Sequence, residues 1–333
     1  MSTRLRVRVR GAGIVGLAVA AELLRRGHEV EVVDRAPGSG ASGVAAGMLA
    51  PAAEATWAAP GVLELGRRSL GLWPRFAALL GVALPRGGTL LVGHDHGDLL
   101  DVRRQATLLD RPAEALDPDA LRDLEPGLGW VAGGLLLPDD HRVDPREVLA
   151  ALASRVPVVP APGGRSPDVT VLATGARLPA PYSGLVRPVR GEVLRLRVAE
   201  PPGRTVRGWV AGEPVYVVPR PGGEVVVGAT VEEHDGPPVV TAEGVRRLLS
   251  AATTLLPGLD RAEVVELAAR DRPGTVDDLP LVGPTLDPSV VLAAGHFRHG
   301  VLLAPLTAQL VADHLEHGSV HPLTDPRRLL EER

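Results

Sequence analysis

The chain has 333 residues, which is enough for one large domain or two ordinary ones. Hydrophobic residues make up 45% and charged residues 23%, as in a soluble globular protein, and the net charge of −4 gives no electrostatic reason to expect binding to nucleic acid or to an anionic membrane. The absence of cysteine excludes disulfides, thiolate nucleophiles, iron–sulfur clusters and cysteinyl attachment of a cofactor.

No targeting or membrane segment is expected. The first residues run directly into a strand pattern, and the longest apolar stretches are too short, or too interrupted by Gly and Pro, to span a bilayer. These features favour a cytoplasmic location.

A glycine-rich turn near the N-terminus follows a short strand pattern and precedes a helix pattern over residues 14–26. It contains Gly11, Gly13 and Gly16 in the spacing G-x-G-x-x-G. Gly11 permits a tight turn, Gly13 lets a pyrophosphate approach the backbone, and Gly16 lets the helix pack close to the strand. The helix N-terminus then offers free N–H groups to the phosphates.

An acidic residue, Asp34, ends the next strand pattern, Glu29–Val33, and lies about 20 residues after the turn, where a carboxylate binds an adenosine ribose. These features predict a dinucleotide site, although a glycine turn of another α/β protein is the alternative. One feature does not fit the expected central strand before the glycine turn. Arg6, Arg8 and Arg10 alternate with valines, whereas a central parallel strand is usually apolar throughout.

The middle of the chain alternates between helix and strand patterns after a loop-like, small-residue segment at residues 36–55. Helices are expected at residues 61–81, 99–110 and 117–124 and from residue 143, and strands at residues 87–92, 135–138, 156–159 and 169–173.

From residue 186 to residue 232 the pattern becomes antiparallel, with a hairpin turn at residues 219–223. The remaining elements are helices at residues 242–256 and from 300 to about 316, and strands at residues 264–269 and 290–294. A nucleotide unit that is interrupted by a β-rich segment and resumed later predicts two interleaved domains.

Three further blocks identify a family resemblance. They are ASGVAAGMLAP at residues 41–51, RPGTVDDLPLVGP at residues 272–284 and GHFRHGVLLAP at residues 295–305. With the GAGIVG turn, they make the chain from about residue 7 to residue 318 resemble the D-amino-acid-oxidase-type flavoproteins, in particular the glycine oxidases of thiamine biosynthesis.

The resemblance implies an α/β fold, in which a Rossmann-like FAD-binding domain is built from separated segments and a substrate domain contains a large antiparallel sheet. The implied boundaries assign residues 1–82, 141–185 and 271–322 to the FAD-binding domain, residues 83–140 and 186–270 to the substrate domain, and residues 323–333 to a C-terminal tail.

The resemblance also implies noncovalent FAD and its contacts. These are Gly11, Gly13, Ile14, Val15, Gly16, Asp34, Arg35, Ala41, Ser42, Ala46, Gly47, Met48, Val158, His296, Phe297, Arg298, His299, Gly300, Val301 and Leu302. Three departures from the family pattern stand out. Asp34 replaces the frequent Glu, His299 replaces the frequent Asn, and the segment at residues 157–168 is short, so the small β-meander over the FAD is expected to be trimmed.

The family's substrate contacts correspond to Arg272, Tyr216 and Arg298. Arg272 is the expected carboxylate clamp, because a guanidinium matches a carboxylate with two parallel hydrogen bonds. The Tyr216 hydroxyl reaches the same carboxylate, and no side chain is assigned as a catalytic acid or base. The alternatives are a surface loop for Arg272, sheet packing for Tyr216 and loop bonding for Arg298.

Other polar residues are interpreted as structural, and no metal site is expected. His296 and His299 lack nearby acidic partners in the sequence and are expected to bond to loop backbone. Solvated loop or turn positions are expected for Asp277, Asp278, Asp139, Asp140 and His141.

The resemblance implies FAD-dependent oxidation of glycine to an imine, which is hydrolysed to glyoxylate and ammonia or passed to thiazole synthesis, with molecular oxygen reduced to hydrogen peroxide. A homo-oligomer is expected. The alternatives are a related oxidase or dehydrogenase of D-amino acids or N-methyl amino acids, or a flavin-binding subunit without turnover.

Overall fold

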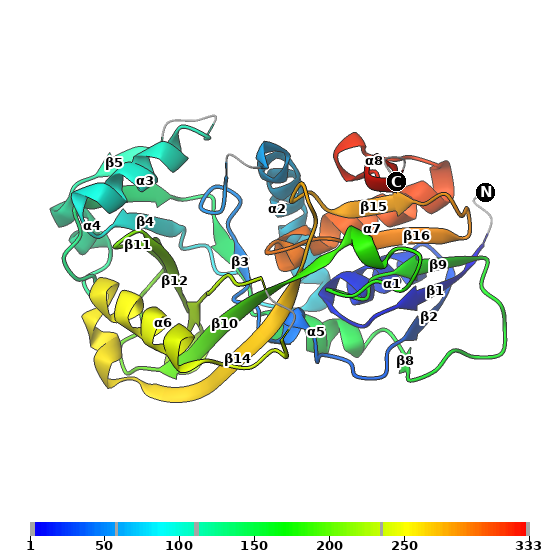
Figure 1. Cartoon of the computed structure of the whole chain (residues 1–333), viewed down its shortest axis with the longest axis horizontal. Helices are drawn as coiled ribbons and strands as arrows, with labels where there is room; N and C mark the ends of the chain where they lie inside the picture. Colours follow the sequence, from blue (N-terminus) through cyan, green and yellow to red (C-terminus); the bar gives the residue numbers. More distant parts are fainter. Residues whose placement is uncertain (1–3, 57–58, 110–112, 234–235, 331–333) are drawn as a thin grey trace.

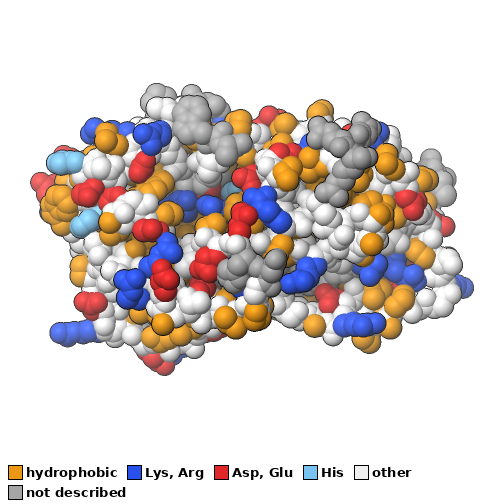
Figure 2. Space-filling model, in the orientation of Figure 1, with side chains coloured by type: hydrophobic (Ala, Val, Ile, Leu, Met, Phe, Trp, Pro, Cys, Tyr) orange, Lys and Arg blue, Asp and Glu red, His pale blue; other side chains and the backbone are white. Residues whose placement is uncertain are grey.

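Two β-sheets lie side by side in the computed structural model, which describes residues 4–56, 59–109, 113–233 and 236–330 (Figure 1). Residue 110 of the expected helix and residues 331–333 of the expected tail lie outside the described residues. On the face in Figure 2, acidic and basic side chains are interspersed over both halves. None of the described helices is long and apolar enough to cross a membrane.

The first sheet has six strands in the order β15-β16-β9-β1-β2-β8. They are β1 (Arg6–Arg10), β2 (Glu29–Val33), β8 (Val158–Val159), β9 (Val169–Leu172), β15 (Leu281–Pro284) and β16 (Val290–Ala294). All neighbours are parallel except β15 and β16. Its apolar side chains form a core with α1 (Ile14–Arg25), α2 (Pro60–Leu80), α5 (Pro145–Ala153) and α7 (Gly300–His317).

The arginines of β1 are explained by the two different faces of this sheet. Val7 and Val9 are completely buried on the helix side. On the other side Arg8 pairs with Glu31 at 2.6 Å and donates to the carbonyl of Gly163. A loop at residues 160–168 covers this face in place of a helix, so a central strand tolerates charged residues there.

The second sheet has eight strands in the order β14-β10-β13-β12-β11-β4-β6-β5, and only β11 and β4 are parallel. They are β4 (Thr89–Gly93), β5 (Glu114–Leu116), β6 (Gly133–Leu137), β10 (Arg187–Arg197), β11 (Thr205–Val210), β12 (Glu213–Pro219), β13 (Glu224–Gly228) and β14 (Glu263–Gly274). The helix α6 (Ala242–Leu255) packs on one face, and α3 (His96–Ala106) and α4 (Pro118–Leu124) flank the far end. Short elements complete the fold: β3 (Met48–Leu49), β7 (His141–Arg142) and α8 (Arg327–Leu330).

The expected mixed α/β fold and the β12–β13 hairpin are confirmed, but two boundaries were wrong and several elements were missed. The helix α3 begins at His96, because Asp95 and Asp98 form a reciprocal capping box. The strand β14 continues to Gly274, beyond the expected end at residue 269, because it pairs with β10 along its whole length. The strands β11 and β15 and the short elements β3, β5, β7 and α8 were not predicted.

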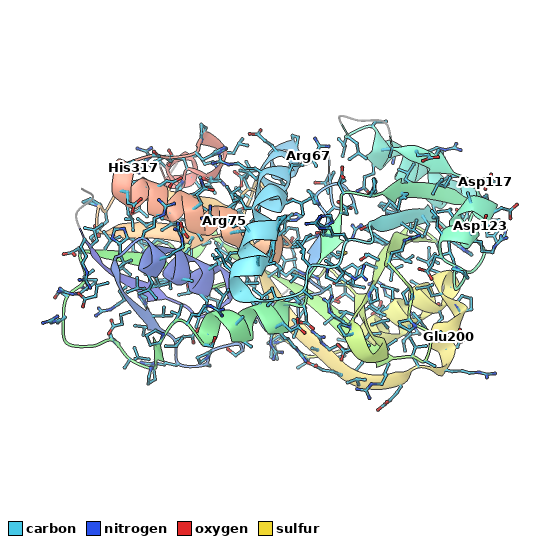
Figure 3. The ribbon with its side chains drawn as sticks, turned by 180° about the vertical axis from the view of Figure 1, so that it is seen from behind. Arg67, Arg75, Asp117, Asp123, Glu200 and His317 are labelled. Carbon is cyan, nitrogen blue, oxygen red and sulfur yellow. The ribbon has the colours of Figure 1, made fainter. Side chains whose placement is uncertain are left out.

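The helices α2 and α7 are joined by buried hydrogen bonds. Seen from behind in Figure 3, α2 lies between the two halves, with Arg67 and Arg75 labelled on it. The side chains of Ser69 and Trp73 donate to the carbonyl of Leu302 at 2.6 and 2.9 Å. Pro305 lacks an N–H and interrupts the internal bonding of α7 nearby, so α2 supports the first turns of α7.

Candidate active site

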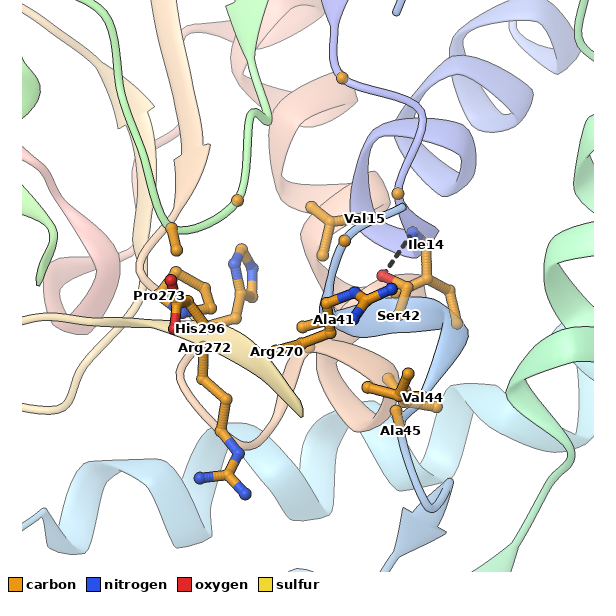
Figure 4. Close-up of a pocket in the computed structure, with 18 of the residues that line it drawn as sticks. Ile14, Val15, Ala41, Ser42, Val44, Ala45, Arg270, Arg272, Pro273 and His296 are labelled. Carbon is orange, nitrogen blue, oxygen red and sulfur yellow. Dashed lines mark hydrogen bonds between the residues drawn. The ribbon is translucent and has the colours of Figure 1, made fainter. Parts of the chain in front are cut away.

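A cavity of about 1140 Å³ is lined by residues of both sheets and by the starts of α1 and α7. Figure 4 shows part of its lining, in which β14, the segment around Ser42 and the start of α1 face one another. Arg270 points toward the Ser42 segment and donates to the carbonyl of Ser39 at 2.8 Å, whereas Arg272 extends away from it.

The glycine turn at this cavity has the geometry expected from its spacing. Gly11 has φ +107°, and a Cβ there would collide with the carbonyl of Ala173. A Cβ at Gly16 would collide with the carbonyl of Gly11, so this glycine allows the close helix–strand contact. Gly13 is the N-cap of α1 and has no side chain to occupy the first N–H groups.

Two polar side chains hold the segments beside this turn. The Ile14 N–H donates to Ser42 Oγ at 3.1 Å, the bond drawn in Figure 4. Asp34 accepts hydrogen bonds from the Ala12 N–H at 2.7 Å and from the Ala36 N–H at 2.8 Å, which fix its carboxylate at the end of β2. Each carboxylate oxygen keeps a lone pair for a ligand hydroxyl.

The cavity lining includes most of the predicted FAD contacts and all three predicted substrate contacts. Gly16, Val158, His299 and Leu302 do not line it. Val158 is half-buried on the edge strand β8, and Pro160 and Pro162 line the cavity in its place. Leu302 is buried between α7 and α2.

Arg272 is on β14 opposite Val189, not in a surface loop. Its guanidinium extends over Gly191, where a Cβ would collide with it, and donates to the Thr230 carbonyl at 3.1 Å. Burial lowers the pKa of Arg272 from its ordinary value, but a guanidinium remains charged at neutral pH. The structure therefore presents a positively charged fork to the cavity.

Tyr216 is on β12 and extends over Gly228, where a Cβ would collide with its hydroxyl. Burial raises the pKa of this phenol, so it is a protonated donor at neutral pH. Arg298 is exposed to the cavity and lies 4.8 Å from the centre of the Phe297 ring. The Phe297 N–H donates to the Pro273 carbonyl at 2.8 Å and ties this loop to β14.

The sequence interpretation of the two histidines needs correction. Among the described residues, His299 has an acidic neighbour that is distant in sequence, since its Nδ1 lies 3.7 Å from Glu54 Oε2. Burial lowers the pKa of His299, so this contact is not an ion pair at neutral pH. His296 bonds to Thr307 Oγ1 at 2.8 Å, not to backbone, and burial lowers its pKa to about 3. Within the described ranges no group of three or more acidic or histidine side chains is placed to hold a metal ion.

Two aspartates expected in solvated positions are partly or wholly buried. Asp140 is 1% exposed and accepts a hydrogen bond from the Ala53 N–H at 3.2 Å. Burial raises its pKa to about 7. Asp277 pairs with Arg328 at 2.7 Å, and this guanidinium lowers the pKa of the Asp277 carboxyl.

Glu54 and Arg207 are among the charged residues of the cavity that the sequence interpretation missed. Arg207 lies on β11 directly opposite Tyr216 of β12. The alternating sequence TVRGWV, separated from VYVV by a short turn, was the available signal for this pair. Glu54 follows a loop, and no local pattern places it beside His299.

These features fit FAD. The start of α1, where the Gly13 N-cap contributes no side-chain hydrogen bond, suits a pyrophosphate, and the Asp34 carboxylate suits a ribose. The cavity is larger than a typical site for a drug-sized ligand, about 300–1,000 Å³, as an extended dinucleotide requires.

The chain is similar to several known proteins. The family described as FAD dependent oxidoreductase, DAO, matches residues 6–314. A Rhizobium etli oxidoreductase named ThiO and assigned to thiamine biosynthesis is 39% identical over 93% of this chain and 96% of its own length. The bifunctional protein ThiO/ThiG of Nostoc is 35% identical over 94% of this chain, which spans only 53% of that protein. The crystal structure of the glycine oxidase of Geobacillus kaustophilus superposes with a TM-score of 0.84 and 29% identity over 96% of each chain.

Proposed function

Because the chain belongs to the FAD dependent oxidoreductase family and its cofactor is therefore FAD, we propose that it oxidises glycine to an imine in this cavity. The observation that carries the proposal is the single cavity shared by the glycine turn and the pair Arg272 and Tyr216. One relative supports glycine as substrate through both its sequence and its crystal structure: the Geobacillus kaustophilus glycine oxidase, which is 31% identical.

The roles of the side chains follow from their positions. Arg272 binds the glycine carboxylate through two N–H groups, and the Tyr216 hydroxyl donates a third hydrogen bond. Arg298, at the loop beside α7, adds positive charge near the same carboxylate. When bound, FAD supplies the redox chemistry by accepting a hydride from the glycine carbon. The chain itself supplies orientation.

The overall reaction consumes glycine, oxygen and water and yields glyoxylate, ammonia and hydrogen peroxide. In the proposal, molecular oxygen is the electron acceptor, and the imine is either hydrolysed or passed to thiazole synthesis. The ThiO relatives support the second fate. A homo-oligomer is also part of the proposal, supported by the exposed Val264 and Leu267 on the edge strand β14, and light scattering of the purified protein measures it.

The experiment is anaerobic titration of the purified yellow holoenzyme with glycine. We expect the flavin absorbance to bleach and to return when oxygen is admitted, with release of hydrogen peroxide. A flavin that is reduced by dithionite but not by glycine at any concentration would refute the glycine assignment.

A further inference from the structure

Arg207 is a charged side chain in the middle of a sheet. It lies on β11 between β12 and β4, opposite Tyr216 on one side and Leu91 on the other. Arg207 is only 7% exposed, yet it lines the cavity. A guanidinium at such a position requires an explanation, because buried arginines are usually paired.

Among the described residues, the Arg207 side chain has no hydrogen-bond partner and no carboxylate within 4 Å, and its Nε is buried without a partner. Three neighbouring charges act on it. Glu54 and Asp140 attract it, and Arg298 repels it. Burial lowers its pKa, although the group stays charged at neutral pH.

Neither acidic group supplies the missing hydrogen bonds. Asp140 accepts a hydrogen bond from the Ala53 N–H, and Glu54 lies beside His299. Two other buried arginines of the same sheet each have a carboxylate partner, since Arg190 pairs with Asp271 at 2.7 Å and Arg195 with Glu224 at 2.7 Å. Arg207 differs from these two arginines in having no carboxylate partner, and unlike them it lines the cavity.

The sheet places Arg207 in one cross-strand row with Tyr216 and Gly228. Cross-strand partners are about 5 Å apart, so Arg207 and Tyr216 stand side by side. The Tyr216 side chain extends from β12 over Gly228 of β13. From the edge of the sheet, the Arg272 side chain extends from β14 over Gly191 of β10. The charges of both Arg272 and Arg207 act on the Tyr216 phenol, and Arg272 is already assigned to the carboxylate of an amino acid.

We propose that Arg207 binds a second carboxylate of the substrate, so that the preferred substrates are small amino dicarboxylates, with the extra carboxylate on the side chain or on the amino nitrogen. This inference rests on the proposed function in one respect, namely that the cavity oxidises an amino acid held by Arg272. It does not require that glycine itself be the best substrate.

The experiment compares glycine with iminodiacetate and D-aspartate on the FAD-loaded enzyme. The apparent dissociation constant of each is measured by anaerobic flavin reduction, or by the change in flavin absorbance where no reduction follows. Arg207→Met removes the charge and keeps much of the apolar length, whereas Arg207→Lys keeps the charge. Arg197→Met, on the exposed end of β10, is the control for loss of an arginine away from the cavity.

We expect at least one dicarboxylate to bind the unmodified enzyme more tightly than glycine. Arg207→Met should weaken that binding about 10- to 100-fold, with a much smaller change for glycine, as expected when a charge-assisted hydrogen bond is lost. Arg207→Lys should recover part of the lost dicarboxylate affinity. Arg197→Met should change the affinity for neither the dicarboxylate nor glycine. Because the buried guanidinium has no partner in the chain, the thermal midpoint of Arg207→Met should equal or exceed that of the unmodified enzyme.

Three results would overturn the inference: dicarboxylates that bind no better than glycine, an equal loss for glycine and dicarboxylates in Arg207→Met, or a lower thermal midpoint or FAD content in that variant. The last would assign Arg207 to structure or to the cofactor. The outcomes also separate the two proposals. Reduction by a dicarboxylate but not by glycine refutes the glycine assignment alone, and reduction by glycine without dicarboxylate binding refutes this inference alone.

Discussion

At the scale of single residues, the site depends on glycines that make room for larger side chains. Gly191 and Gly228 each occupy a strand position where a Cβ would collide with the functional group of Arg272 or Tyr216. Long polar side chains can therefore lie along the sheet surface. The burial that results strengthens their hydrogen bonds to a ligand and excludes competing water.

Arg272→Lys should weaken glycine binding by about 1.5–3 kcal/mol, because lysine keeps the charge but loses the planar pair of donors. The variant should still purify with FAD and need much more glycine for flavin reduction. The matched control is Arg270→Lys on the same strand, whose side chain bonds to the Ser39 carbonyl on the Ser42 side of the cavity. Equal glycine affinities of Arg272→Lys and the unmodified enzyme would remove Arg272 from the site.

Asp140→Asn should stabilise the protein most at alkaline pH. The folded-state pKa of Asp140 is about 7, well above its ordinary value of 3.8, so the folded protein retains a proton that the unfolded chain has lost. Stability is therefore lost as the pH rises from about 4 to about 7. Asparagine does not titrate and keeps an oxygen that accepts the Ala53 N–H.

The measurement is the thermal midpoint of Asp140→Asn and of the unmodified protein at pH 5 and pH 8. Asp139→Asn, at the exposed neighbouring position, is the control. The midpoint difference between Asp140→Asn and the unmodified protein should grow with pH. A difference that is constant across this range would show that Asp140 does not titrate there.

At the scale of elements, α2 holds the start of α7 against the cavity. The Leu302 carbonyl accepts two side-chain hydrogen bonds in a fully buried contact, from Ser69 and Trp73. Either donor alone satisfies the carbonyl. Removal of both leaves this carbonyl without a donor from α2, so the effects of the two substitutions are coupled.

Trp73→Phe and Ser69→Ala should each lower the free energy of unfolding by about 0.5–1.5 kcal/mol, and the double variant should lose more than the sum of the two. Unfolding of the three variants with saturating FAD forms a double-mutant cycle. If the loss in the double variant equals the sum of the two single losses, the hydrogen bonds of Ser69 and Trp73 to the Leu302 carbonyl are energetically independent.

At the scale of the whole molecule, the cavity is built by both sheets. Its lining includes the β1–α1 turn of the six-stranded sheet and side chains of β10, β11, β12 and β14 of the eight-stranded sheet. We propose that these sheets are the centres of the FAD-binding and substrate domains, with the boundaries expected from the sequence. A ligand that contacts both sheets stabilises them together.

FAD should therefore raise the thermal midpoint, with a contribution of about 2.7 kcal/mol when free FAD is 100 times its dissociation constant. Since the chain has no cysteine, acid precipitation should release all flavin into the supernatant. Yellow colour that remains with the precipitated chain would contradict noncovalent binding. A midpoint that does not change with added FAD would contradict stabilisation of both sheets by the cofactor.

The sequence by itself determined the local features of this protein. The glycine spacing predicted the turn at Gly11 and the close packing at Gly16, and Asp117 and Asp144 cap their helices as the Asp-Pro pairs indicate. These features depend on residues close together in the chain. Their geometry is therefore encoded in short patterns.

Only the tertiary structure decided the remaining charges of the site. Arg207 becomes a neighbour of Leu91 through parallel pairing of strands that are distant in sequence, and Glu54 meets His299 across most of the chain. Asp140 lies in a turn by its local pattern, yet it is buried. The physical reason is that strand pairing across long connections and the desolvation of a charge are sums over many distant contacts, which no local pattern contains.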